Sequence, residues 1–146
     1  DFTADYVNQV GIDLAWQHGP LMVVAEHMHA QTRSPENGDP KFTGSYLMLS
    51  WMLTGESRPY LRAVGSIGPV TPSSRYGAFE LVTRYSQIDL ADGAIDGGEL
   101  DKWYVGANWW ISRQWKAGVS WGDADLFRNG MNGNTRMWLL RLQWIY

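Results

Sequence analysis

The chain has 146 residues, a formal net charge of −3 and no cysteine. The charge argues against a basic nucleic-acid-binding surface, the lack of cysteine excludes disulfides and thiolate metal sites, and no stretch of about 18 apolar residues provides a transmembrane helix. Nine tryptophans and seven tyrosines are the unusual feature. Aromatic side chains pack the cores of soluble β proteins or lie at lipid–water boundaries, so the composition leaves both classes open.

Apolar and polar residues alternate with a period of two, which predicts β-strands along the chain. The first strand is expected at residues 6–17, and a tight turn at His18, Gly19 and Pro20 leads to a second strand at 20–32. One face of this pair is apolar, and the other carries Gln, Gly and acidic residues together with Met22 and Val24. The apolar face comprises Val10, Ile12, Leu14, Trp16, Leu21, Val23 and Ala25.

A polar loop is expected at residues 33–41, followed by a strand at 45–53 that is apolar on both sides. The next connection, residues 54–77, has 24 residues, although it lies on the side of the sheet where the other turns are short. In the strand before it, the residues expected to point outward are Leu47, Leu49, Trp51 and Leu53.

Four more strands complete the prediction, which gives seven in all. They are expected at residues 78–88, 103–111, 115–121 and 135–146. The connections between them are a short turn at 112–115 and two longer polar loops at 89–102 and 123–134.

The last strand gives the clearest signal. Its even positions are apolar, its odd positions include Arg141 and Gln143, and it ends on the aromatic Tyr146. Outer-membrane barrels commonly finish on such a strand, with the terminal aromatic serving as an assembly signal. The apolar stripe comprises Trp138, Leu140, Leu142, Trp144 and Tyr146.

These patterns predict an all-β fold, a transmembrane antiparallel β-barrel in which residues 1–146 form part of one domain. The expected strands are long enough for a tilted bilayer crossing, and the small polar residues on their second face indicate a watery lumen. Single-chain bacterial barrels have even strand numbers, so seven strands cannot close alone. We therefore expect partner strands, either N-terminal to Asp1 or on a second chain, unless one strand is miscounted. A soluble aromatic-rich β-sandwich is the rival fold.

Three stretches of the sequence resemble the phosphate-selective porin O/P family. They are SWMLTGESRPY at residues 50–60, GAFELVTRYSQIDLADGAIDGGELDKW at 77–103 and VGANWWISRQWKAGVSW at 105–121. The family pattern is a strand ending in TGE-x-RPY, a long turn, a GAFEL-x-RYS strand, a Gly-rich acidic loop and a G-x-NW strand. The resemblance covers nearly the whole chain and is most specific from Ser50 to Trp121.

The resemblance implies a barrel of about 16 strands, usually a homotrimer in the bacterial outer membrane, of which this chain would form the C-terminal part. It implies passive diffusion of small anions such as phosphate or polyphosphate, with arginines and lysines along the path. The alternatives are a general non-selective porin and a structural barrel that anchors another envelope component. The partners expected are outer-membrane lipid and small anions, not nucleic acid.

Candidate pore-lining residues follow from the predicted faces. Arg84, Lys116 and Arg141 are expected in the lumen, where cations attract anions. The same assignment also places three acids there, which opens the alternative of an ion-pair network that stiffens the wall. These acids are Asp13, Glu26 and Glu80.

The long connection contains three more basic residues, Arg58, Arg62 and Arg75. A connection of this length either folds into the pore, as the resemblance implies, or packs as a solvated turn under the rim.

Enzymatic and metal functions find little support. No G-x-S-x-G motif is present, and no cofactor or metal is expected. The acids of the loop at 89–101 do not have the D-x-D-x-D-G spacing of a calcium loop. His27 and His29 share a strand face, where an interfacial or subunit-contact role is favoured over a metal pair.

Overall fold

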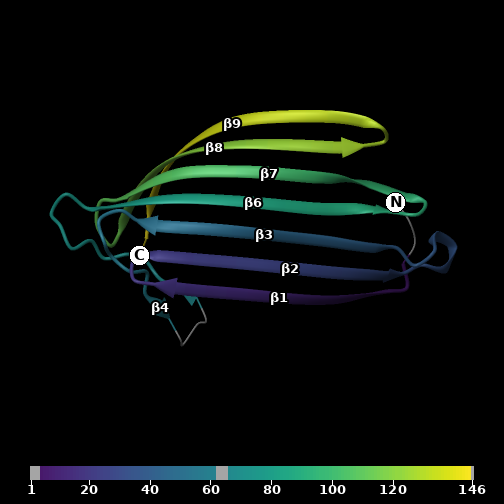
Figure 1. Cartoon of the computed structure of the whole chain (residues 1–146), viewed down its shortest axis with the longest axis horizontal. Coiled ribbons are helices and arrows are strands. Elements are labelled where there is room, and N and C mark those ends of the chain that lie inside the picture. The colour runs from purple at the N-terminus through teal and green to yellow at the C-terminus, as the bar shows by residue number, and fades with distance from the viewer. Residues whose placement is uncertain (1–3, 62–65, 146) are drawn as a thin grey trace.

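The computed structural model describes residues 4–61 and 66–145, so the expected role of Tyr146 lies outside the described residues. All seven expected strands are present, and they form one antiparallel sheet in the order β1-β2-β3-β6-β7-β8-β9 (Figure 1). The all-β antiparallel prediction is thereby confirmed. The strands are β1 (Tyr6–His18), β2 (Leu21–Arg33), β3 (Lys41–Met52), β6 (Ala78–Asp92), β7 (Ile95–Trp110), β8 (Trp115–Arg128) and β9 (Met131–Trp144).

Two short strands and one helical turn lie between these long strands. β4 (Tyr60–Leu61) pairs with β5 (Ser66–Ile67) inside the long connection, and the 3-10 turn η1 (Pro35–Asn37) lies between β2 and β3. No helix in the described residues is long and apolar enough to cross a membrane.

The sheet has two distinct ends. We call the end with residues 19–20, 53–61, 66–77 and 111–114 the connection end. The opposite end has residues 34–40 and two tight turns. β1 begins at the opposite end and β9 finishes at the connection end (Figure 1).

The prediction of two long polar loops at 89–102 and 123–134 is wrong, because strands occupy most of both ranges. β6 and β7 are joined by Gly93 and Ala94 alone, and β8 and β9 by Asn129 and Gly130 alone. Asn129 and Gly130 both have positive φ (52° and 72°), as a two-residue hairpin turn of type I′ requires. Pairing with neighbouring strands thus overrides the low strand preference of Asp and Gly, and the strands extend to 12–16 residues.

The strand register confirms the expected apolar face. Leu14, Ala25 and Leu47 lie side by side on it, and Leu47, Leu49, Trp51 and Leu53 are all exposed as expected. Aromatic side chains lie near both limits of the apolar band on this convex face, as at lipid–water boundaries. Near one limit are Tyr85, Trp103, Trp121 and Trp138, and near the other are Phe79, Trp109, Trp115 and Trp144.

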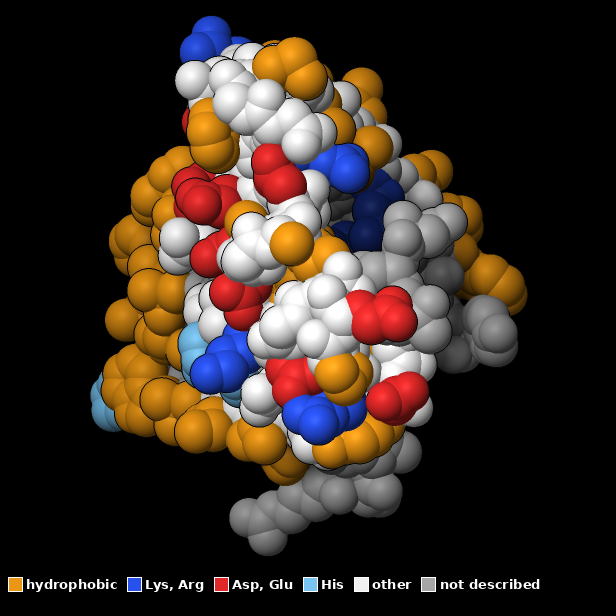
Figure 2. Space-filling view, turned by 90° about the vertical axis from the view of Figure 1, so that its right-hand side faces the viewer, with side chains coloured by type: hydrophobic (Ala, Val, Ile, Leu, Met, Phe, Trp, Pro, Cys, Tyr) orange, Lys and Arg blue, Asp and Glu red, His pale blue; other side chains and the backbone are white. Residues whose placement is uncertain are grey.

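Figure 2 looks along the sheet from the opposite end and shows hydrophobic side chains gathered along the outer margin. The buried apolar cluster, by contrast, is small and lies at the connection end. It consists of Met52, Val70, Ala78 and Trp110, with Ile145 packed against it. Val70 belongs to the long connection and is fully buried, so the connection folds back onto the sheet.

Candidate functional site: a basic hollow on the concave face

The concave face of the sheet holds a hollow of about 530 Å³ at its centre and connection end. It is lined mainly by inward-facing residues of β3, β6, β7, β8 and β9, together with one residue of the long connection. Its charge is strongly unbalanced, because Glu80 is the one carboxylate among the described lining residues. The basic lining residues are Arg58, Arg84, Lys102, Lys116 and Arg141.

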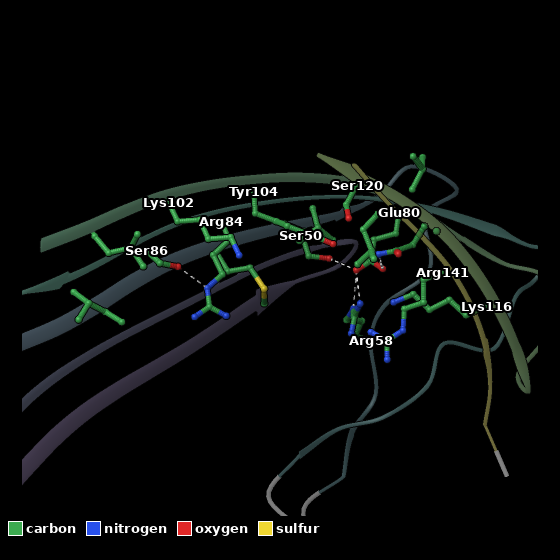
Figure 3. Close-up of a pocket in the computed structure, with 18 residues that line it drawn as sticks. Ser50, Arg58, Glu80, Arg84, Ser86, Lys102, Tyr104, Lys116, Ser120 and Arg141 are labelled. Carbon is green, nitrogen blue, oxygen red and sulfur yellow. Dashed lines mark hydrogen bonds and ion pairs between the residues drawn. The ribbon is translucent and has the colours of Figure 1, made fainter. Parts of the chain in front are cut away.

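The register explains why these side chains converge. Side chains on one face of a sheet recur at every second residue. Glu80 is opposite Asn108, which is opposite Gly118, which is opposite Arg141, so all four belong to one row across β6–β9. Lys116 belongs to the next row, beside Trp110. Figure 3 shows Lys116 and Arg141 at the same end of the hollow as Glu80.

Glu80 is the buried charged group of the hollow, with 1% of its surface exposed. Its Oε1 accepts hydrogen bonds from Ser50 Oγ at 2.5 Å and from Arg58 Nε at 2.9 Å. Its Oε2 accepts from Asn108 Nδ2 at 3.0 Å and from Trp110 Nε1 at 3.1 Å. A buried carboxylate needs such partners, since an unpaired one would be strongly destabilising.

Arg58 supplies the countercharge. Besides the Nε contact, a terminal guanidinium nitrogen forms an ion pair with Glu80 Oε1. Only 16% of the Arg58 side chain is exposed, and its guanidinium carbon lies 5.5 Å from the centroid of the Trp110 ring. Arg58 is thus engaged by the wall of the sheet.

Arg84 and Lys116 are placed by aromatic rings. The guanidinium carbon of Arg84 lies 3.8 Å from the centroid of the Tyr46 ring, and its Nε donates to Ser86 Oγ at 2.9 Å. The Lys116 ammonium lies 4.5 Å from the centroid of Trp110. Such cation–π contacts orient a cation without neutralising it. Within the described part of the chain, neither residue forms an ion pair with a carboxylate.

The expected candidate residues therefore separate into groups. Arg84, Lys116, Arg141 and Arg58 come together in the hollow, but Arg58 is taken up by an ion pair. Arg75 lies outside the hollow, exposed and stacked against Tyr76. Arg62 lies outside the described residues.

Of the three acids expected in the lumen, the structure places two outside the lining of the hollow and one within it. Asp13 and Glu26 lie directly opposite each other across β1 and β2, on the same face as the hollow but not in its lining. Glu80 alone joins the basic residues. The expected balance of three acids against three bases therefore does not describe the hollow, whose lining is predominantly basic.

Sequence reasoning missed Lys102, because it was assigned to the end of a loop. In the structure it lies on β7, two residues before Tyr104, and lines the hollow. Extending the alternation of Tyr104, Gly106 and Asn108 back by one step would have placed it on that face.

The long connection is also closed upon itself at Glu56. The Glu56 carboxylate accepts hydrogen bonds from the Ser73 backbone N–H at 3.0 Å, from Ser73 Oγ at 2.6 Å and from the Thr54 hydroxyl. Partial burial alone would raise the pKa of Glu56, but these hydrogen bonds outweigh it and lower the pKa to about 2.

The two histidines expected at an interface lie on the convex face. His27 Nδ1 lies 2.8 Å from Ser45 Oγ, so a hydroxyl rather than a second ring is its neighbour. Across residues 4–61 and 66–145, no group of three or more His, Asp and Glu side chains is arranged to hold a metal ion.

Comparisons with known proteins agree with this architecture. A family model described as phosphate-selective porin O and P matches residues 2–146. Porin O of Pseudomonas aeruginosa is 26% identical over 151 residues, covering 93% of this chain and 34% of that protein. An uncharacterized protein of Caulobacter vibrioides is 30% identical over 104 residues, covering 68% of this chain and 21% of that protein. The chain thus spans about a third or less of the length of these relatives.

Proposed function

Because this chain belongs to the phosphate-selective porin O and P family and lies in the bacterial outer membrane, we propose that its sheet forms part of the wall of a water-filled channel through which anions diffuse passively. The convex face, with its exposed apolar side chains between aromatic limits, would contact lipid. The concave face would line the water path.

The observation that carries anion passage is the charge of the hollow. Five basic side chains of the described residues line it, and Glu80 is already paired with Arg58. The remaining cations are held on walls of Ser, Asn and Tyr, where they raise the local concentration of anions. These cations are Arg84, Lys102, Lys116 and Arg141.

Phosphate is the solute we propose, with polyphosphate as its extended form. Arginine forks and lysine ammonium groups bind phosphate oxygens through charge-assisted hydrogen bonds. Arg84 and Arg141 each offer such a fork toward the hollow. Lys102 offers a point charge beyond Arg84, toward the opposite end, and Lys116 offers one beyond Arg141, toward the connection end. A phosphate ion would pass from one cation to the next without a single deep binding site.

Closure of the channel requires further strands. Within the described residues, β1 and β9 each pair on one side only, which leaves two open edges. Unsatisfied strand edges are not tolerated in lipid. We propose that additional strands of the same barrel, or of a second chain, pair with these edges, and that the complete barrel assembles as a homotrimer.

We also propose that the long connection narrows the pore at the connection end. Arg58 reaches from it into the hollow, and Val70 anchors its returning half in the buried cluster. Arg75 would then contribute positive charge near the entrance rather than inside the hollow.

Electrical measurement on the complete protein in a planar bilayer tests this function. In a potassium chloride gradient, the reversal potential should report anion preference, and added phosphate should reduce the chloride current by competing for the same cations. Cation preference would contradict the proposal. Anion preference without any effect of phosphate would indicate a general porin, and the absence of conductance would indicate a structural barrel.

A further inference from the structure

The contacts of Glu80 assign it a role that its charge alone does not predict. An acidic residue in an anion path is unfavourable for anions, yet Glu80 is among the most buried side chains of the described residues. It accepts hydrogen bonds from three different segments, namely Ser50 of β3, Arg58 of the long connection, and Asn108 and Trp110 of β7.

Arg58 is the ion-pair partner of Glu80. It is the described basic residue of the connection that enters the hollow, and both its Nε and a terminal nitrogen contact the same Glu80 oxygen. Arg75, on the same connection, contacts Tyr76 and remains exposed. The two arginines thus carry the same charge but have different structural roles.

Trp110 links this ion pair to the apolar attachment of the connection. Its indole N–H donates to Glu80, its ring lies beneath Arg58, and it shares a buried cluster with Val70. The connection is therefore fixed to the sheet at two positions, residue 58 by charge and residue 70 by apolar packing. Both positions use the same tryptophan.

We propose that Glu80 and Arg58 form a latch that docks the 53–77 connection onto the channel wall, so that Arg58 is a positioning residue rather than part of the anion path. Without the latch, the first half of the connection loses its charged attachment while Val70 still holds the second half. Lys116 is affected as well, because the ring beneath its ammonium is oriented by the hydrogen bond to Glu80.

A purely electrostatic role for Glu80 predicts a different outcome. If Glu80 only added negative charge to the path, Glu80→Gln would raise anion preference and leave the connection as firmly held as before. The latch predicts that the same substitution loosens the connection. The electrostatic role and the latch therefore predict different degrees of attachment of the connection, which can be measured without ion flow.

Limited digestion of the folded, detergent-solubilised protein with chymotrypsin provides that measurement, since Tyr60 and Tyr76 lie within the connection. We expect Glu80→Gln and Arg58→Met to be cleaved there about tenfold faster than the parent protein, as a lost hydrogen-bonded charge pair implies. The matched control Arg75→Met removes the same charge from the same connection and should change the rate less than twofold. Equal rates for Arg58→Met and the parent protein would overturn the latch.

A double variant, Arg58→Met with Glu80→Met, covers the case in which a single variant fails to fold. Replacing both members of a buried ion pair by apolar residues is often tolerated. We expect this variant to fold, as judged by its heat-dependent gel mobility, and still to be cleaved about tenfold faster. A parental cleavage rate in the folded double variant would overturn the proposal.

The conductance readout of the latch rests on the proposed channel, whereas the digestion readout does not. In bilayers, Arg58→Met should give larger and more variable single-channel currents than Arg75→Met, because the connection no longer holds one position. Currents identical to those of the parent protein would count against the latch. The absence of any current in the parent protein would contradict the proposed function. The latch would then be tested by the digestion experiment alone.

Discussion

The ammonium nitrogen of Lys116 lies 4.5 Å from the centroid of the Trp110 ring. The ring holds the charge at the connection end of the hollow and leaves it available to a passing anion, because a cation–π contact does not neutralise it. Lys116 is therefore a cation at this end of the hollow that an aromatic ring positions and that forms no ion pair with a carboxylate of the described residues.

Reversing this charge should weaken anion preference. We expect Lys116→Glu to lower the anion-to-cation permeability ratio roughly threefold, since two charge units change beside the path while salt screens the effect. Reversal potentials in a potassium chloride gradient measure the ratio. Lys41→Glu is the matched control, because Lys41 begins β3 at the opposite end of the sheet, outside the lining of the hollow. An unchanged ratio in Lys116→Glu would show that Lys116 does not face the path.

A charged substitution on the convex face should destabilise the barrel more than the same substitution on the concave face. Leu140 and Leu139 are neighbours on β9, but Leu139 lines the hollow and Leu140 points the other way, with 81% of its surface exposed. We expect Leu140→Lys to destabilise the barrel in lipid by about 2–4 kcal/mol and Leu139→Lys to cost much less. Denaturant unfolding in lipid vesicles measures both. Equal losses would contradict the lipid-facing assignment of this strand.

Gly77 should be irreplaceable where the long connection enters β6. Its φ is +87°, and a Cβ there would clash with the Trp110 backbone carbonyl and lie 2.6 Å from Trp109 Nε1. We expect Gly77→Ala to cost about 2 kcal/mol or more of unfolding free energy, because strain and steric clash combine.

Gly19→Ala separates these two causes. Gly19 also has a positive φ (+54°), but a Cβ there would meet nothing within 4 Å. Backbone strain alone should cost about 1 kcal/mol. If the two variants were equally stable in denaturant unfolding, the close approach of Gly77 to the β7 backbone would not be limiting.

The hydrogen bonds that Glu56 accepts from Ser73 and Thr54 form a clasp within the long connection, and this clasp should be sensitive to acid. Its pKa of about 2 in the folded protein lies below the ordinary value of 4.5, so the charged carboxylate favours the folded connection. This contribution is complete above pH 4.5 and is lost as the pH falls toward 2. A carbon-13 NMR titration of the Glu56 carboxyl in detergent should show the low midpoint, and Ser73→Ala should raise it. A parent midpoint near 4.5 would contradict the clasp.

Much of the fold follows from local patterns in the sequence. Alternation with period two predicted the seven strands and their faces, and it placed Arg84, Lys116 and Arg141 together on the concave side. It succeeds because a strand turns successive side chains to opposite faces regardless of its neighbours.

Strand length and pairing depended on tertiary contacts instead. The acidic and glycine-rich residues at 89–102 have the composition of a loop, but hydrogen bonding to neighbouring strands extends β6 and β7 through them. That extension places Lys102 in the hollow, where the sequence had been read as solvent-exposed loop.

The sequence by itself determined the strands, their two faces and which strand cations share the concave one, because these depend on a repeat of two residues. Only the tertiary structure decided that Arg58 pairs with Glu80, 22 residues away, while Arg75 remains outside. No local pattern distinguishes the two arginines. The difference arises where a long connection returns to the sheet, and its path depends on contacts between distant parts of the chain.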